Sequence, residues 1–189
     1  MPENLSPLLA MSSIRHVFLL ATWCMFAMAC LHATTASAQL QSRQNFAVTV
    51  PSNLSITAPP NVGMMHNQTD ANQTFPLQRW RVVGNSIRGV TVSFSTDGPF
   101  VHNTDATSQR DVQLGLSIAS SSGVGRWILT QAIDSTDYAN RDSYATVSAM
   151  SNGTATATFD LQVSFLTDTY GSFPAGLYET TVTGTITAN

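Results

Sequence analysis

The sequence predicts an all-β protein, an antiparallel β-sandwich of about eight or nine strands that follows a cleaved leader. Three observations lead to this fold class. Apolar and polar residues alternate near the end of the chain, where Tyr178, Val182 and Ile186 would share one face. Such alternation is the period of a strand with one buried face. Short extended segments recur between turn signals, and no segment after the leader has convincing helical spacing.

The N-terminus has the three parts of a secretory signal peptide. Arg15 and His16 supply a short basic region, and residues 17–31 are almost wholly apolar. Ala36-Ser37-Ala38 follows as a small-residue cleavage box, so that the mature chain would begin at Gln39. A membrane anchor is the alternative, because the apolar run is about as long as the shorter spanning helices. The absence of a basic flank after the run favours cleavage.

Residues 39–189, the predicted mature chain, suit one β-sandwich domain by length, with residues 1–38 as the signal peptide. Both cysteines, Cys24 and Cys30, would leave with the leader, so the mature chain could form no disulfide. Residues 39–189 contain seven arginines and no lysine, against ten acidic residues. This balance argues against binding to nucleic acid or to anionic membrane surfaces. We expect no membrane span in the mature chain.

The first extended segment, residues 43–50, places Phe46, Val48 and Val50 on one face. Pro51 interrupts it, and a short extended piece resumes at residues 54–56. Proline in such runs belongs at edges and turns. The polar stretch that follows predicts a long loop at 61–78. Further strands are then expected at 79–83, 89–95, 112–118, 126–131, 144–150 and 154–165.

Two features of the C-terminal half predict how strands connect. Asn152-Gly153 lies between two extended segments, which is a strong signal for a β-hairpin. The final alternation, from Tyr178 almost to the terminus, predicts one continuous strand. A polar loop with room for a helical turn is expected at 134–142, and another loop at 120–123.

The two ends of the predicted domain resemble a known family. Pro174-Ala175-Gly176-Leu177-Tyr178, followed by Val182 and Ile186, is similar to the closing strand of bacterial secreted pilin-like domains of the spore coat protein U type. Phe46-x-Val48-x-Val50 with Ile56 resembles their first strand. The resemblance implies an immunoglobulin-like or pilin-like sandwich, and subunits that join by β-strand addition. It also implies a location in the periplasm or at the cell surface, with a periplasmic chaperone as a possible partner.

Under this resemblance the strand donor would be the segment that carries Phe46, Val48 and Val50. Self-association, or pairing with another exported β-domain, would follow. The alternative is that the segment is the first strand of its own sheet, because alternation alone fits both.

No residue pattern indicates catalysis. The mature chain has two histidines, His66 and His102, and neither stands in a nucleophile motif. The single mature glutamate, Glu179, lies on the hydroxyl-rich face of the last strand, without the second placed acid that glycoside cleavage needs. We therefore expect a non-enzymatic protein without a cofactor.

Two binding sites remain as alternatives. Trp80 and Trp127, each beside arginine, could stack on sugar rings, although a buried tryptophan with arginines on the other sheet face explains Trp80 as well. The loop at 134–142 concentrates oxygen ligands that calcium favours, although turns and caps use the same residues. The calcium candidates are Asp134, Asp137, Asn140 and Asp142.

The sequence thus favours an exported structural subunit of a surface coat or fibre. A carbohydrate-binding or adhesive β-sandwich is the second function that it allows.

Overall fold

The computed structural model describes residues 40–189. The predicted signal peptide and its cleavage site lie outside the described residues. The chain divides into two units after Val48, and the second unit, residues 49–189, contains every strand of the described part. Within residues 40–189, no helix has the length and apolar character needed to cross a membrane.

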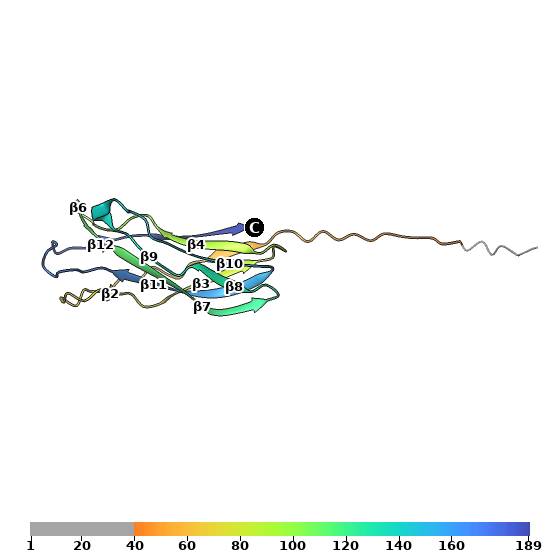
Figure 1. The fold of residues 1–189 in the computed structure, drawn as a ribbon, viewed down its shortest axis with the longest axis horizontal. Helices are drawn as coiled ribbons and strands as arrows, with labels where there is room; N and C mark the ends of the chain where they lie inside the picture. Colours follow the sequence, from red (N-terminus) through yellow and green to blue (C-terminus); the bar gives the residue numbers. More distant parts are fainter. Residues whose placement is uncertain (1–39) are drawn as a thin grey trace, which may run out of the picture. The chain divides into compact units, whose positions relative to one another are not determined.

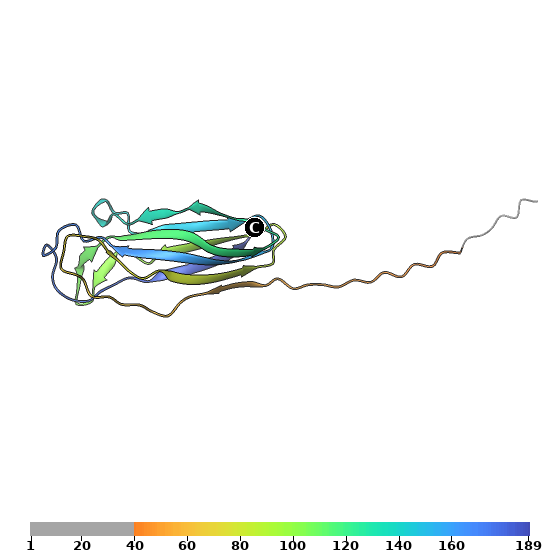
Figure 2. The same cartoon turned by 90° about the horizontal axis from the view of Figure 1, so that it is seen from below.

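The prediction of an all-β sandwich is confirmed for the described residues. Two antiparallel sheets form the layers, as Figure 1 and Figure 2 show. One sheet has the order β1-β3-β11-β7-β9, with β2 also paired to β11, and the other has the order β13-β4-β10-β8. A third, smaller sheet has the order β12-β5-β6. The strands are β1 (Leu54–Thr57), β2 (Gln73–Thr74), β3 (Gln78–Gly84), β4 (Val90–Thr96), β5 (Phe100–His102), β6 (Asp105–Arg110), β7 (Val112–Gly123), β8 (Trp127–Gln131), β9 (Ile133–Ser135), β10 (Thr146–Ser151), β11 (Ala155–Phe165), β12 (Tyr178–Glu179) and β13 (Val182–Ala188).

Alternation along the strands builds the core between the two larger sheets. In β4, each second residue from Val90 is buried, and β11 follows the same pattern over most of its length. Four aromatic rings connect the layers through edge contacts. Trp80 meets Phe94 at 5.1 Å between ring centroids, Phe94 meets Phe159 at 6.0 Å, and Phe159 meets Trp127 at 5.1 Å. Edge-to-face pairs of this kind add to the free energy gained from burial alone.

Residues 43–50, the first predicted strand, form no strand in the described structure. The first strand, β1, begins at Leu54. Asn85 fixes the chain just before it, because its side chain accepts from the Asn53 N–H at 2.6 Å and donates to the Pro51 carbonyl at 2.9 Å. Alternation makes a segment competent to be a strand, but a strand also needs a partner edge.

The hairpin predicted at Asn152-Gly153 is wrong. The strand before it, β10, pairs with β4 and β8, whereas β11 after it pairs with β2, β3 and β7. The Asn-Gly pair therefore connects the two layers instead of two neighbours in one sheet. Side-chain bonds hold this corner: Ser151 Oγ accepts from the Val90 N–H and donates to the Gly153 carbonyl.

The single strand predicted from Tyr178 onward is divided in two. β12 pairs with β5, and β13 pairs with β4, so the chain changes sheets at Thr180-Thr181. Asp97 holds this break, because one of its oxygens accepts from the Thr181 N–H at 2.9 Å and from the Thr180 hydroxyl at 3.1 Å.

Several smaller boundaries also differ from the prediction. The expected loop at 120–123 belongs to β7, and the loop expected at 61–78 contains the short strand β2 and the start of β3. Residues 40–189 contain thirteen strands, against the eight or nine expected, because the six-residue β6, the short strands β2, β5 and β9, and the division of the last strand were not predicted. The predicted helical turn within 134–142 is present as a 3-10 helix at Tyr138–Asn140.

Candidate functional site

A groove with core side chains in its lining lies where the edge of the larger sheet is incomplete. β1 ends at Thr57, which pairs with Arg81 of β3. β3 begins three residues earlier, at Gln78, so within residues 40–189 its first part has β11 on one side and no strand on the other. A groove of about 650 Å³ opens beside this unpaired edge. Residues 58–64 line one part of it and residues 177–182 line another.

Much of the groove lining belongs to the hydrophobic core. Trp80, Phe100, Leu161 and Val163 are all at least nine-tenths buried, and each lines the groove. Half-buried Phe75 stacks on Phe100, with ring centroids 5.9 Å apart. The groove therefore reaches core side chains that a complete sheet edge would cover.

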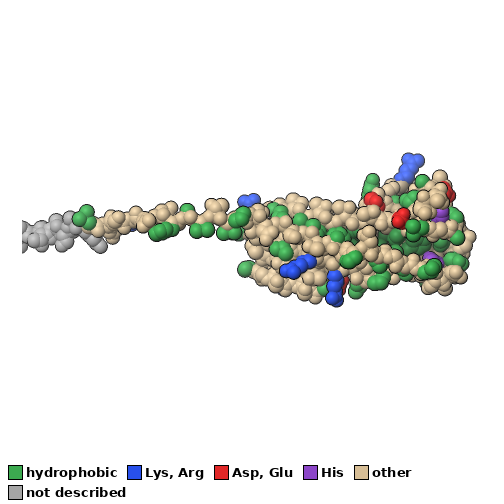
Figure 3. Space-filling model, turned by 180° about the vertical axis from the view of Figure 1, so that it is seen from behind, with side chains coloured by type: hydrophobic (Ala, Val, Ile, Leu, Met, Phe, Trp, Pro, Cys, Tyr) green, Lys and Arg blue, Asp and Glu red, His purple; other side chains and the backbone are tan. Residues whose placement is uncertain are grey.

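The rim of the groove combines apolar and polar side chains. Val62, Met64 and Leu177 line it and remain 44%, 41% and 55% exposed. Among the lining residues, Glu179 is the one that carries a charge. Figure 3 shows apolar side chains gathered at the end of the domain where the histidines lie, with acidic side chains beside them. Polar residues also line the groove, namely Asn61, Gln78, Thr180 and Thr181. Apolar side chains beside a few polar groups are typical of a binding site.

His102 supports the wall of the groove that contains Leu177 and Tyr178. Its Nε2 donates to the Ala175 carbonyl at 3.2 Å, and its Nδ1 accepts from the Thr104 N–H at 3.3 Å. The ring also meets Tyr178 edge-on at 5.0 Å. Gly176 must be glycine here, because a Cβ would lie 1.9 Å from His102 Nε2.

Tyr178 joins this wall to the buried aromatic residues behind it. Its hydroxyl donates to the Pro174 carbonyl at 3.0 Å. Burial raises the pKa of Tyr178 above its ordinary value of 10.0. The phenol therefore stays neutral and keeps its donor at physiological pH.

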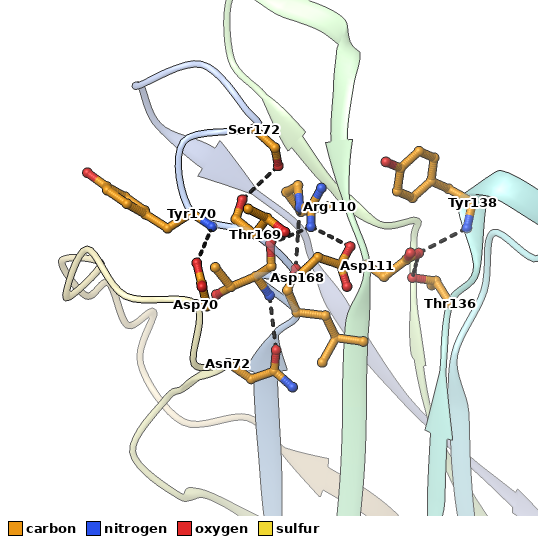
Figure 4. Close-up of polar contacts among 12 residues, drawn as sticks. Asp70, Asn72, Arg110, Asp111, Thr136, Tyr138, Asp168, Thr169, Tyr170 and Ser172 are labelled. Atoms are coloured by element: carbon orange, nitrogen blue, oxygen red, sulfur yellow. Dashed lines mark hydrogen bonds and ion pairs between the residues drawn. The ribbon is translucent and has the colours of Figure 1, made fainter.

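A polar network holds the loops at this end of the domain (Figure 4). Arg110, at the end of β6, donates to the carbonyls of Leu166 and Thr167 and to Asp168 Oδ2 at 2.6 Å. Its guanidinium also lies 4.9 Å from the ring centre of Phe173. A second contact comes from Asp70, whose carboxylate accepts from the Tyr170 N–H at 2.7 Å. These bonds satisfy loop backbone groups, and they explain Arg110 as a structural residue.

The predicted strand-donor residues are strongly exposed. Phe46, Val48 and Val50 are 81%, 89% and 77% exposed. None belongs to a strand of the described residues. Their alternation in the sequence is that of a strand, and only the structure shows that they lie outside the strands of the two sheets.

The two predicted glycan-binding tryptophans lie apart from each other and are buried. Trp80 is 8% exposed and lines the groove, while Trp127 is 7% exposed and lines a separate hollow of about 390 Å³ beside β8. Arg79 and Arg81 are exposed on the opposite sheet face from Trp80. This is the arrangement of a core tryptophan between two surface arginines. The indole nitrogens of both tryptophans are buried without a hydrogen-bond partner.

In the predicted calcium-binding loop, Asp134 and Asp137 use carboxylate oxygens in hydrogen bonds within the protein. Asp134 Oδ2 accepts from the Thr146 N–H at 2.7 Å. Asp137 caps the 3-10 helix by accepting from the backbone and side-chain nitrogens of Asn140 at 3.2 and 2.6 Å. Asp137 and Asp142 also pair through their backbones. Within residues 40–189, no three His, Cys, Asp or Glu side chains cluster as metal ligands would.

The groove is a candidate site that the sequence did not predict. Its lining comes from separate parts of the chain, and the individual residues read as ordinary core or loop positions. Two weak signals were present: Ala58-Pro59-Pro60 ends β1 early, and apolar Val62 and Met64 stand in an otherwise polar loop.

Comparison of the chain with models of known protein families and with curated proteins finds no match.

Proposed function

We propose that this protein is an exported structural subunit of a surface coat or fibre, and that its subunits join by β-strand addition. Strand addition uses main-chain hydrogen bonds at a sheet edge for affinity and alternate side chains for specificity. A subunit of this kind needs a free strand-competent segment and a sheet edge that can receive it.

The observation that carries the proposal is the state of residues 44–50. Their apolar side chains alternate as in a half-buried strand, yet Phe46, Val48 and Val50 are exposed and belong to no strand of residues 40–189. Exposed apolar residues in a strand pattern are costly in solution unless a partner covers them. The predicted leader supports export, and the hydroxyl-rich strand faces suit a surface protein.

The test is light scattering coupled to size-exclusion chromatography on residues 39–189, refolded at increasing protein concentration. We expect discrete multimers, and a folded monomer when residues 39–50 are deleted. Replacing Phe46, Val48 and Val50 by serine should have the same effect as deletion. The matched control replaces Ala47 and Thr49 by serine on the other face of the segment, and it should leave the multimers intact.

Two results would contradict this function. A chain that stays monomeric at every concentration would rule out self-assembly through this segment. A deletion that unfolds the domain would show that the segment is one of its own core strands.

Carbohydrate binding is the second candidate, and one observation favours it. Trp80 lines the groove together with polar Gln78 and Glu179, which could bond sugar hydroxyls. This function predicts a monomer and a saturable interaction with a glycan that weakens on Trp80→Phe.

A further inference from the structure

Three connections between strands lie together at the end of the sandwich that is marked C in Figure 1. They are residues 84–90 between β3 and β4, residues 123–127 between β7 and β8, and residues 151–155 between β10 and β11. Glycines let the connections touch. A Cβ on Gly89 would lie 1.9 Å from the Ser151 carbonyl oxygen, and one on Gly125 would lie 2.5 Å from the Gly153 carbonyl oxygen. We call the surface formed by these three connections the tip.

Two aliphatic side chains project from the tip into solvent. Ile87 is 89% exposed and Val124 is 93% exposed. Their turns lie on either side of Gly153, because a Cβ there would be 3.5 Å from Gly125 Cα and 3.9 Å from the Ile87 carbonyl oxygen. Neither residue belongs to the core, so the stability of the fold does not account for its apolar character. Exposed apolar side chains that gather on one surface indicate an interaction.

The tip is positively charged, although acidic residues outnumber basic ones in residues 39–189. Arg88 and Arg126 belong to it, both are exposed, and neither forms an ion pair within residues 40–189. The three connections contain no Asp or Glu. The acidic residue closest to them in sequence is Asp160, which lies roughly 17 Å along β11 from its first residue. That distance is about two Debye lengths at physiological salt. A free carboxylate at Asn189, which lies beside the tip, would offset one arginine and leave the tip positive.

We infer that the tip docks on an anionic phospholipid surface. Ile87 and Val124 enter the boundary between headgroups and acyl chains, while Arg88 and Arg126 pair with lipid phosphates. Binding at a membrane surface combines buried apolar area with the attraction of cations to anionic lipid, and the tip supplies both. The charge favours lipid over a second copy of this chain, because two tips that met would bring like charges together. Since the acidic residues lie elsewhere, the domain meets the membrane with this end.

The inference goes beyond the proposed function, because strand addition uses none of these four side chains. The N-terminal segment nevertheless joins the domain at the same end, where Asn85 of the first connection bonds to Pro51 and Asn53. The tests therefore have to separate the tip from residues 44–50.

The first test is co-sedimentation of residues 39–189 with lipid vesicles. We expect binding to vesicles of phosphatidylglycerol and phosphatidylcholine, and weaker binding to phosphatidylcholine alone or at raised salt. Arg88→Gln with Arg126→Gln should lower the partition coefficient on the anionic vesicles by roughly 25-fold, since each cation near such a surface contributes about fivefold. Ile87→Ser with Val124→Ser should weaken binding to both kinds of vesicle.

A matched control and a label locate the contact. Met65→Ser with Arg141→Gln removes the same kinds of exposed side chain from outside the tip and should bind as wild type does. Residues 39–189 contain no cysteine, so one can be added and labelled with bimane. The emission of the label on Val124→Cys should shift to the blue on anionic vesicles. The same label on Met65→Cys should not shift.

The outcomes keep this inference apart from the assembly proposal. Replacing Phe46, Val48 and Val50 by serine should abolish multimers and leave vesicle binding intact. The Ile87→Ser, Val124→Ser variant should do the reverse. If the mature chain stays monomeric but binds vesicles through the tip, the assembly proposal falls and the inference stands.

Four results would overturn the inference. The first is no binding to anionic vesicles even at low salt. The second is vesicle binding that the tip variants leave unchanged, or that is lost with the N-terminal segment. The third is loss of multimers on Ile87→Ser with Val124→Ser, without vesicle binding, which would assign the tip to a second copy. The fourth is binding to soluble heparin and not to vesicles, which would assign the arginines to a polyanion.

Discussion

Single residues decide where this sandwich tolerates change, and Gly184 is the clearest case. It lies on the inward face of β13, where a Cβ would be 2.7 Å from Ile56 Cδ1 and 2.9 Å from Trp80 Cζ3. The missing side chain lets β1 and the groove tryptophan pack against β13. Because the interior is closely packed, there is no free volume at Gly184 for a larger side chain.

Gly184→Val should therefore destabilise the domain. Overpacking of this kind typically costs ~1–3 kcal/mol of unfolding free energy. Chemical denaturation followed by tryptophan fluorescence would measure the loss. Thr185→Val, at the next and outward-facing position of β13, is the matched control and should change stability little. If Gly184→Val and Thr185→Val lost the same unfolding free energy, the close approach of Gly184 to Trp80 would not be what excludes a larger side chain.

The hydrogen bonds of Asp105 predict how the stability of the domain changes with pH. Its carboxylate accepts from the hydroxyls of Thr107 at 2.6 Å and Ser108 at 2.7 Å, and from the Thr107 N–H. These bonds, that of the Thr107 hydroxyl first, lower the pKa of Asp105 from 3.8 to about 2. Since the folded-state pKa is the lower one, the stabilisation is present above pH 3.8 and is lost as pH falls toward 2. Between pH 3.8 and about 2, the unfolding free energy of wild type should therefore fall more steeply than that of Asp105→Asn. If the unfolding free energies of the two proteins changed in parallel with pH, this prediction would be wrong.

At the scale of elements, loops at one end are held to strands mainly by side chains. Arg110 at the end of β6 bonds two loop carbonyls and Asp168, and its side chain is 8% exposed. Arg79 offers a contrast, because it forms an ion pair with Asp160 across β3 and β11 while its own side chain is 75% exposed. Hydrogen bonds from a buried charged group contribute much more to stability than an exposed ion pair does.

Arg110→Met should cost more stability than Arg79→Met. The first change removes charged hydrogen bonds, each worth ~1.5–3 kcal/mol, and leaves loop carbonyls without donors. The second removes a surface pair worth ~0–1 kcal/mol. Thermal unfolding of the two variants beside wild type measures the difference. Amide hydrogen exchange should also quicken in residues 166–173 of the Arg110 variant alone. A larger loss from Arg79→Met would overturn this assignment.

At the scale of the whole molecule, the core is complete without the N-terminal segment. Residues 49–189 contain all the strands and all the buried core residues of the described chain. Within residues 40–189 the first part of β3 has no strand beside it at the groove, and β8, β9 and β13 are also edge strands of their sheets. Open sheet edges and an unpaired segment with strand-like alternation are the two features that the proposed strand addition needs.

Deletion of residues 39–48 should leave the stability of the isolated monomer almost unchanged. Exposed side chains outside the packed structure usually alter unfolding free energy by no more than about 0.5 kcal/mol. Circular dichroism and thermal unfolding, compared at a concentration where both chains are monomeric, would check this. A cooperative transition at a much lower temperature would mean that the segment contributes to the fold.

Much of the fold could be predicted from local pattern, and the errors have a common cause. Alternation identified the buried positions of β4, β7 and β11, because side-chain direction along a strand depends only on the chain itself. The hairpin predicted at Asn152-Gly153 is wrong because each flanking strand buries one face in either arrangement. The alternation of the sequence does not tell whether the two strands pair in one sheet or lie in the two sheets on opposite sides of the core. The break at Thr180-Thr181 depends on Asp97, which is distant in sequence.

The candidate site also has some features that the sequence predicts and others that only the structure shows. The sequence by itself determined the all-β class, the inward and outward faces of most strands, and the apolar alternation of residues 44–50, since each depends on a local period. Tertiary structure alone decided which strands pair, that Trp80 and Trp127 are buried, and that β1 stops short of the start of β3. The groove exists only because separate segments meet around that gap, and contacts between distant segments leave no periodic signal in one sequence.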